Sequence, residues 1–284
     1  MRRLLAGAVV LGYFISKNFT RPILRLVNYR VDDIIEKKNP KDIWLRAQDG
    51  IKLHARYIPE GEEHVILLHG YHSSPSRDFS TMIPYYLEKG YSLLLPDVRS
   101  HGKSGGNLIT FGAKESLDAK LWIDFLVGSG VKRILIHGVS MGAATTLLLR
   151  TLDLPEEVEL MILDCPYIDA YDQILDSAGK KGKVMPTITP PFCSLLGVVG
   201  LQLKEILPYQ GLGKIGVPML MIHGTGDHFV KARNTVRAYV DSDEERELHL
   251  FKHAPHARSM KMYPKEYKEV VENFLAKHNF LRED

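Results

Sequence analysis

The chain has 284 residues, of which 45% are hydrophobic and 25% are charged, a composition typical of a globular protein with enough chain for one large domain. Its net charge of +3 is concentrated at the N-terminus, because residues 1–41 contain nine Lys and Arg against three Asp and Glu. The remaining chain is slightly acidic, which excludes a nucleic-acid-binding protein. The two cysteines, Cys165 and Cys193, are too few for a disulfide framework or a metal site. They predict free buried thiols, with one bridge between them as the alternative.

Residues 1–19 have the pattern of a signal peptide or a signal anchor. Two arginines follow Met1, residues 4–16 carry no charge, and Lys17 begins a basic flank. No small-x-small cleavage site follows the apolar stretch, which favours a retained anchor. The stretch is shorter than the ~20 residues of a full membrane span, so a helix packed on the domain or on a second copy of the chain is the alternative. Basic residues on both sides leave the orientation in the membrane open.

Residues 20–41 link this segment to the rest of the chain. Apolar residues recur there at helical spacing and alternate with charged ones. The pattern predicts an amphipathic helix that lies either on a membrane surface or against the domain, which begins at residue 42.

From residue 42 onward, strand and helix patterns follow each other. The predicted strands cover 42–48, 51–58, 64–68, 91–95, 134–136, 158–163, 217–222 and 247–251, and the predicted helices cover 80–89, 114–127, 141–150 and 263–277. Asp49 and Gly50 predict a tight hairpin turn in which both residues have positive φ. The alternation predicts an α/β fold, with a mainly parallel twisted sheet of about eight strands, an antiparallel edge hairpin and helices on both faces.

The pentapeptide Gly138-Val-Ser-Met-Gly142 matches G-x-S-x-G between a predicted strand and a predicted helix. A serine at such a junction takes a strained backbone conformation, and Gly138 and Gly142 remove the side chains that would clash there. The arrangement would expose the Ser140 hydroxyl beside a helix N-terminus, where an anion is stabilised. Ser140 is therefore the candidate nucleophile.

About fifty residues separate the strand that ends near Leu163 from the one that starts at Val217, which is too long for a simple crossover. Residues 166–207 therefore predict a small helical cap over the carboxyl edge of the sheet, and its apolar part, 192–203, would pack on the domain and line a pocket. Ligands of open α/β sheets bind at that edge, so the cap is expected to select the substrate.

A serine hydroxyl is a weak nucleophile until a base removes its proton and a third group orients that base. Asp227 follows a predicted strand in a glycine-rich loop, and its carboxylate could orient an imidazole. His253 and His256 follow the last predicted strand, and either could be the base. Asp164 also follows a strand and is an alternative acid.

At this point the chain resembles the α/β-hydrolase superfamily in its serine-hydrolase branch. The order Ser140, Asp227, His256 is the order of that family. Two further motifs of the family are His69-Gly70 and the segment from Asp97 to Ser104, Asp-x-Arg-x-His-Gly-x-Ser. The resemblance covers about residues 42–280. The chain is similar in style to bacterial monoglyceride-lipase-like and prolyl-oligopeptidase-like hydrolases that carry an N-terminal anchor.

The resemblance also assigns roles to single residues. It implies that His256 is the base, because the family's base is followed by a small residue, here Ala257. It implies an oxyanion hole made of the backbone N–H groups of Tyr71 and Met141. The other histidines at strand ends, together with Asp97 and Arg99, are expected to be structural: His69, His101, His137 and His223. No cofactor and no metal are expected, since the histidines are scattered and no phosphate-binding loop follows the first parallel strand.

The function implied by this resemblance is a serine hydrolase that cleaves carboxylic esters or related acyl compounds through an acyl-enzyme on Ser140. The small size of the predicted cap favours short to medium acyl chains. The serine excludes the branches that use an aspartate nucleophile. A peptidase or acyl-aminoacyl hydrolase and a thioesterase are alternatives on the same fold, and a catalytically silent membrane-attached binding protein is the alternative of another class. The expected partners are a small acyl substrate and, through residues 4–16, a bacterial membrane on its extracytoplasmic face. The cytoplasmic face and the oligomeric state remain open.

Overall fold

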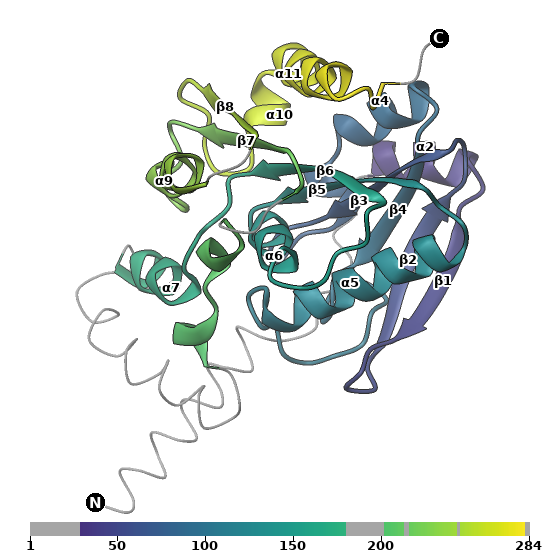
Figure 1. Cartoon of the computed structure of the whole chain (residues 1–284), viewed down its shortest axis with the longest axis horizontal. Helices are drawn as coiled ribbons and strands as arrows, with labels where there is room; N and C mark the ends of the chain where they lie inside the picture. Colours follow the sequence, from purple (N-terminus) through teal and green to yellow (C-terminus); the bar gives the residue numbers. More distant parts are fainter. Residues whose placement is uncertain (1–28, 180–201, 213–215, 243–244, 282–284) are drawn as a thin grey trace, which may run out of the picture.

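The computed structural model describes residues 29–179, 202–212, 216–242 and 245–281. In these ranges eight strands form one sheet in the order β1-β2-β4-β3-β5-β6-β7-β8 (Figure 1). The strands are β1 (Lys41–Arg46), β2 (Lys52–Ile58), β3 (Glu63–Leu68), β4 (Ser92–Asp97), β5 (Arg133–Val139), β6 (Val158–Asp164), β7 (Met219–Gly224) and β8 (Arg246–Phe251). β2 is antiparallel to both β1 and β4, whereas all other neighbours are parallel. The predicted fold class is confirmed.

Helices cover both faces of the sheet (Figure 1). They are α2 (Tyr29–Lys37), α3 (Pro75–Asp78), α4 (Met82–Glu88), α5 (Ala113–Gly128), α6 (Met141–Leu149), α7 (Ala170–Gly179), α9 (Arg233–Asp241), α10 (Ser259–Met262) and α11 (Pro264–Lys277). Successive side chains of a strand point to opposite faces of the sheet, so alternate residues pack against the two helical layers. Val65 and Leu67 of β3 pack with α2, α4 and α11, whereas Ile66 and Leu68 pack with α5 and α6.

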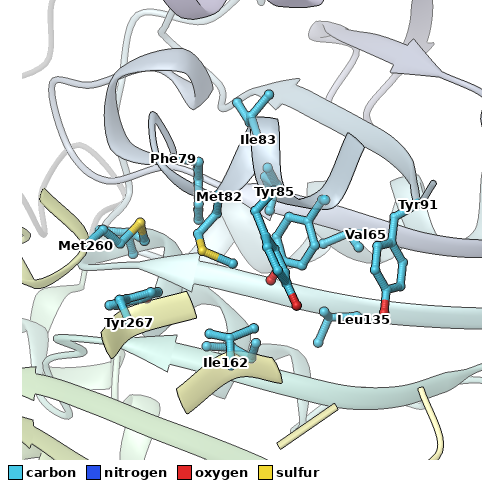
Figure 2. Packing of buried hydrophobic residues seen from close by; sticks show 14 of the residues in the cluster. Val65, Phe79, Met82, Ile83, Tyr85, Tyr91, Leu135, Ile162, Met260 and Tyr267 are labelled. Atoms are coloured by element: carbon cyan, nitrogen blue, oxygen red, sulfur yellow. The ribbon is translucent and has the colours of Figure 1, made fainter. Parts of the chain in front are cut away.

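The first of these layers contains a cluster of large buried side chains (Figure 2). Side chains from the α3–α4 region, from the residue before β4 and from the C-terminal helices pack against three neighbouring parallel strands. The strands contribute Val65, Leu135 and Ile162, and the side chains that pack on them include Phe79, Met82, Ile83, Tyr85, Tyr91, Met260 and Tyr267. The cluster attaches the last helices of the chain to the strands that end at the candidate nucleophile. Burying one such side chain stabilises the fold by roughly 1.5–3 kcal/mol.

The hairpin between β1 and β2 exists, but its turn differs from the expectation. Gly50 has a φ of +82°, whereas Asp49 does not have a positive φ. The Gly50 N–H donates to the Ala47 carbonyl (2.8 Å), and the Ala47 N–H donates to the Ile51 carbonyl (2.9 Å). This is the three-residue loop that ends in a left-handed glycine, so only one position needs positive φ.

Within the predicted amphipathic linker, α2 lies against the domain. Val31 and Ile35 are buried in the core, and Arg56 of β2 donates to Asp32 (2.8 Å) and Glu36 (2.9 Å) on the other side of the helix. The predicted anchor, residues 1–19, lies outside the described residues. Among the helices that are described, none is long and apolar enough to cross a membrane.

The predicted cap is described at its two ends. α7 opens it, and the short 3-10 helices η1 (Leu203–Glu205) and η2 (Pro208–Gly211) close it. Backbone hydrogen bonds join the ends, from Ala170 to the Ile206 carbonyl and from Tyr209 to the Ile168 carbonyl, each at 3.1 Å. Residues 180–201, which hold Cys193 and most of the predicted pocket-lining stretch, lie outside the described residues.

The sequence patterns missed three helices. α3 and α10 have four residues each, too few to show a period. In α9 only Thr235 and Ala238 are buried, so the helix has no apolar stripe of the kind that marks a core-facing helix.

Candidate active site

Ser140 occupies the turn between β5 and α6, in a strained conformation with φ +55° and ψ −114°. The glycines on either side have no room for a side chain. A Cβ at Gly138 would lie 2.5 Å from the Gly142 carbonyl oxygen, and a Cβ at Gly142 would lie 1.9 Å from the Leu68 carbonyl oxygen. The turn is thus wedged against β3, as expected for a nucleophile elbow.

The structure brings Ser140, His256 and Asp227 together from three distant parts of the chain. The Ser140 Oγ lies 2.9 Å from the His256 Nε2, and the His256 Nδ1 lies 2.6 Å from the Asp227 Oδ2. Because a carboxylate only accepts hydrogen bonds, it places the imidazole proton on Nδ1 and leaves Nε2 able to accept the serine proton.

The Asp227 carboxylate is held on all sides. Its Oδ1 accepts the backbone N–H groups of Phe229 (2.7 Å) and Val230 (2.9 Å), and its Oδ2 also lies 3.2 Å from the His223 Nε2. Burial acts to raise the pKa of Asp227, but the hydrogen bonds from His223 and His256 outweigh it and hold the pKa well below its usual value. The carboxylate therefore stays ionised while it supports the imidazole.

His253, the alternative base, and Asp164, the alternative acid, have other hydrogen-bond partners. His253 is exposed, and its backbone N–H donates to the Thr225 Oγ1 (2.8 Å). Asp164 is buried, accepts the Tyr267 hydroxyl at 3.1 Å and accepts the Ser140 N–H with its main-chain oxygen at 2.8 Å. Burial raises the pKa of Asp164 to about 6. Neither side chain makes a direct hydrogen bond to the Ser140–His256–Asp227 chain among the described residues.

The two predicted oxyanion donors lie at the start of α6 and in the loop after β3, on either side of Ser140. Met141 is the first residue of α6, so its N–H has no partner within the helix. Tyr71 follows Gly70, where an added Cβ would lie 3.2 Å from the Ser140 Cβ. The His69 Nε2 accepts the Val98 N–H (3.1 Å), so its Nδ1 donates to the Gly70 carbonyl (2.8 Å).

The remaining strand-end histidines are hydrogen-bonded in the scaffold, and His223 also lies beside the Asp227 carboxylate. The His137 ring nitrogens lie 3.0 Å from the Tyr86 hydroxyl and 3.1 Å from the Tyr267 hydroxyl, and burial lowers the pKa of His137 to about 3. The His223 Nδ1 lies 2.6 Å from the Thr235 Oγ1. The His101 Nδ1 donates to a main-chain carbonyl two residues before it.

Asp97 and Arg99 fix the loop after β4. The Asp97 Oδ2 lies 2.7 Å from the His54 Nδ1 and accepts the Lys103 N–H at 2.9 Å. Arg99 donates twice to Asp118, both at 2.6 Å. His54 and Asp118 stand in no motif, so their roles are visible only in the structure.

Aromatic side chains lie beside His256 and in the loop that follows Gly70. The Phe229 ring lies 5.0 Å from the His256 ring, and Tyr71 stacks on Phe111 at 5.8 Å. The buried cluster at this end of the sheet comprises Val98, Ile109, Met141, Ala144, Leu148, Tyr167, Ala170, Leu203, Ile206 and Val230.

Within the described residues, one group of His, Cys, Asp and Glu side chains lies close enough to share a metal ion. It consists of Cys165, Asp227 and His256, whose donor atoms lie within 4.8 Å of one another. Burial raises the pKa of the Cys165 thiol, which disfavours a thiolate ligand, and the other two residues are already hydrogen-bonded to each other. The donor set does not favour a resident cation.

Together, the sheet topology and the serine elbow define a class of protein, and the chain belongs to the α/β-hydrolase superfamily. Within it, the matching family model is described as "Serine aminopeptidase, S33" and covers residues 59–205. The chain is similar to the esterase Pf2001 of Pyrococcus furiosus, with 27% sequence identity, a TM-score of 0.72 and coverage of 90% of this chain and 98% of that one.

Two further proteins are similar over most of the chain. The esterase EaEST of Exiguobacterium antarcticum has the same fold, with 18% identity, a TM-score of 0.62 and coverage of 84% of this chain and 100% of that one. The uncharacterized protein YqkD of Bacillus subtilis is 27% identical over 286 residues, 92% of each chain. The family model and the match to Pf2001 identify the protein as a hydrolase.

Proposed function

We propose that this protein is a serine esterase. Ser140 attacks the carbonyl carbon of a carboxylic ester while His256 accepts the hydroxyl proton, and the ionised Asp227 stabilises the imidazolium that forms. The negative charge that develops on the carbonyl oxygen is stabilised by the N–H groups of Tyr71 and Met141. Removing one such donor costs about 10²–10³ in kcat in other hydrolases.

The intermediate then collapses. The bond to the alcohol oxygen breaks, His256 gives its proton to that oxygen, and an acyl ester remains on Ser140. Water attacks the acyl carbon in the second half-reaction, with His256 as its base, and releases the acid and free Ser140. These steps use Ser140, His256, Asp227, the two backbone N–H groups and one water molecule.

The observation that carries the proposal is the hydrogen-bonded chain from the Ser140 Oγ through His256 to Asp227. The preference for an ester rests on two further points. Pf2001, which is similar over most of the chain, is named an esterase. A buried apolar cluster that includes Met141, the residue after Ser140, lies at this end of the sheet, which suits an acyl chain.

The family description favours a second candidate, a serine aminopeptidase. That activity passes through the same acyl-enzyme, and it requires in addition a group that binds the substrate's ammonium. A thioesterase would use the same steps as the esterase. An apolar pocket separates acyl chains by only ~1–3 kcal/mol per methylene, so selectivity should be broad, with short to medium chains preferred.

One assay tests the proposal. Purified protein is given p-nitrophenyl esters from acetate to dodecanoate, aminoacyl-naphthylamides and an acyl thioester in parallel, with Ser140→Ala as the control. We expect the highest kcat/KM on the shorter esters and fluorophosphonate labelling of Ser140. Faster cleavage of the naphthylamides would replace the esterase with the aminopeptidase, and a protein that is neither labelled nor active would support the silent binding protein.

A further inference from the structure

The loop that carries Tyr71 closes on Asp78, a half-buried residue at the end of α3 that has no part in the Ser140–His256–Asp227 chain. The Gly70 N–H donates to the Asp78 Oδ2 at 2.7 Å. The Ser73 Oγ donates to the Asp78 Oδ1 at 2.5 Å. One carboxylate thus binds the loop on both sides of Tyr71.

These contacts bear directly on the predicted oxyanion donor. The Tyr71 N–H and the Gly70 carbonyl belong to one planar peptide unit, so they turn together. The His69 Nδ1 holds the Gly70 carbonyl at 2.8 Å, and Asp78 holds the Gly70 N–H. Both polar groups of Gly70 are therefore fixed, and with them the direction of the Tyr71 N–H.

Gly70 also has little freedom to move. A Cβ built on it would lie 3.2 Å from the Ser140 Cβ and 3.3 Å from the Asp78 Oδ2. The loop backbone is packed between the nucleophile on one side and the carboxylate on the other. A displacement of Asp78 would therefore shift the loop relative to Ser140.

We infer that Asp78 is a positioning residue for the oxyanion hole. It sets the distance and direction of the Tyr71 N–H relative to Ser140 and does not touch the substrate. The inference rests on the proposed esterase function. Removing Asp78 should lower the rate as much as misplacing the Tyr71 N–H would, because an error of about 1 Å in a catalytic geometry can cost about 10²-fold in rate.

The test separates geometry from charge at this position. Asp78→Ala removes both hydrogen bonds and should lower kcat by roughly 10–100-fold with KM changed less than about threefold. Asp78→Asn keeps an oxygen for the Gly70 N–H and offers an amide to the Ser73 hydroxyl, so it should retain activity within about threefold of wild type. Arg77→Ala, an exposed neighbour on α3, is the matched control and should leave kcat unchanged.

A second readout distinguishes positioning from a merely structural role. A phenylboronic acid inhibitor forms a tetrahedral adduct on the serine whose oxygen lies in the oxyanion hole. Its Ki should rise in Asp78→Ala by the same factor by which kcat/KM falls, because both depend on the Tyr71 donor. Circular dichroism and Tm report folding, and Ser73→Ala, which removes one of the two bonds, should show a smaller loss of the same kind if Asp78→Ala does not fold.

The outcomes are distinct. If the wild-type protein is active and Asp78→Ala has the same kcat and the same boronate Ki, this inference is overturned and the proposed esterase function stands. A fall in kcat without a rise in the boronate Ki also overturns it. A wild-type protein with no activity and no fluorophosphonate labelling overturns the proposed function and this inference with it.

Discussion

Replacing Asp164 with Asn gives the most informative single perturbation, because this carboxyl was the alternative acid and is deeply buried. The side chain is 1% exposed, its Oδ2 accepts the Tyr267 hydroxyl, and its Oδ1 has no hydrogen-bond partner among the described residues. Burial raises the pKa of Asp164 from 3.8 to about 6. The folded protein therefore holds this proton more tightly than the unfolded chain does.

The sign and size of the effect follow from that difference. A raised carboxyl pKa contributes stability that is complete below pH 3.8 and is lost as the pH rises to about 6, and the loss amounts to roughly 3 kcal/mol. Asn does not titrate and still accepts the Tyr267 hydroxyl, although its buried amide costs about 1 kcal/mol at every pH. The free energy of unfolding of Asp164→Asn minus that of wild type should therefore rise by about 2 kcal/mol between pH 4 and pH 7, because part of the full loss already lies below pH 4.

Urea unfolding of both proteins at pH 4, 5, 6 and 7 measures this difference. Asp227→Asn is the matched control, because the pKa of Asp227 is lowered and its stabilisation is lost only below pH 3.8, so its difference from wild type should stay nearly constant between pH 4 and pH 7. Parallel stability curves for wild type and Asp164→Asn would refute the assigned burial cost. The variant should also keep kcat within about tenfold of wild type, and a loss as deep as that of Ser140→Ala would make Asp164 the orienting acid.

The remaining predictions concern the nucleophile, the base, the acid and the N-terminus. Ser140→Ala should fold normally and lose at least about 10⁴-fold in kcat, and near-wild-type turnover would contradict the mechanism. His256→Ala should match it while His253→Ala stays close to wild type, and the reverse order in the same kinetic assay would make His253 the base. Asp227→Asn should lower kcat by about 10⁴ with little change in KM, because the imidazole takes the wrong tautomer; an unchanged kcat would remove Asp227 from the mechanism. Deletion of residues 1–20 should give an active protein that leaves the membrane fraction on sedimentation, whereas full-length protein that is monomeric and soluble without detergent would count against the anchor.

The fold was largely predictable because its central strands are short apolar runs separated by helix patterns. Residues such as Ile134 to Ile136 have no polar face, and a strand of this kind is stable only between two helical layers. The central strands follow this logic, and all eight strands were located to within a few residues. α9 was missed because it buries too little to leave a pattern, and the Asp49–Gly50 turn was assigned to the wrong loop type because the dipeptide occurs in both.

The candidate site was predictable in part. A serine between two glycines is visible as a local pattern, and the Gly138 clash with the Gly142 carbonyl is local as well, whereas Gly142 is required by the Leu68 carbonyl of the distant strand β3. The choice of His256 over His253 came from a family resemblance, and the physical basis for it is visible only in three dimensions. His253, with a φ of +59°, lies on the turn itself, whereas His256 reaches both the Ser140 Oγ and the Asp227 carboxylate.

The sequence by itself determined the elements whose causes are local: apolar strands, helices and the strained elbow at Ser140. The tertiary structure decided everything that depends on distant residues meeting. It paired Asp227 with His256, buried Asp164 beside Tyr267, and closed the Tyr71 loop on Asp78, a residue in no motif. The reason is physical: hydrogen bonds and burial depend on separations of a few ångströms in space, and positions far apart along a chain carry no local pattern that records them.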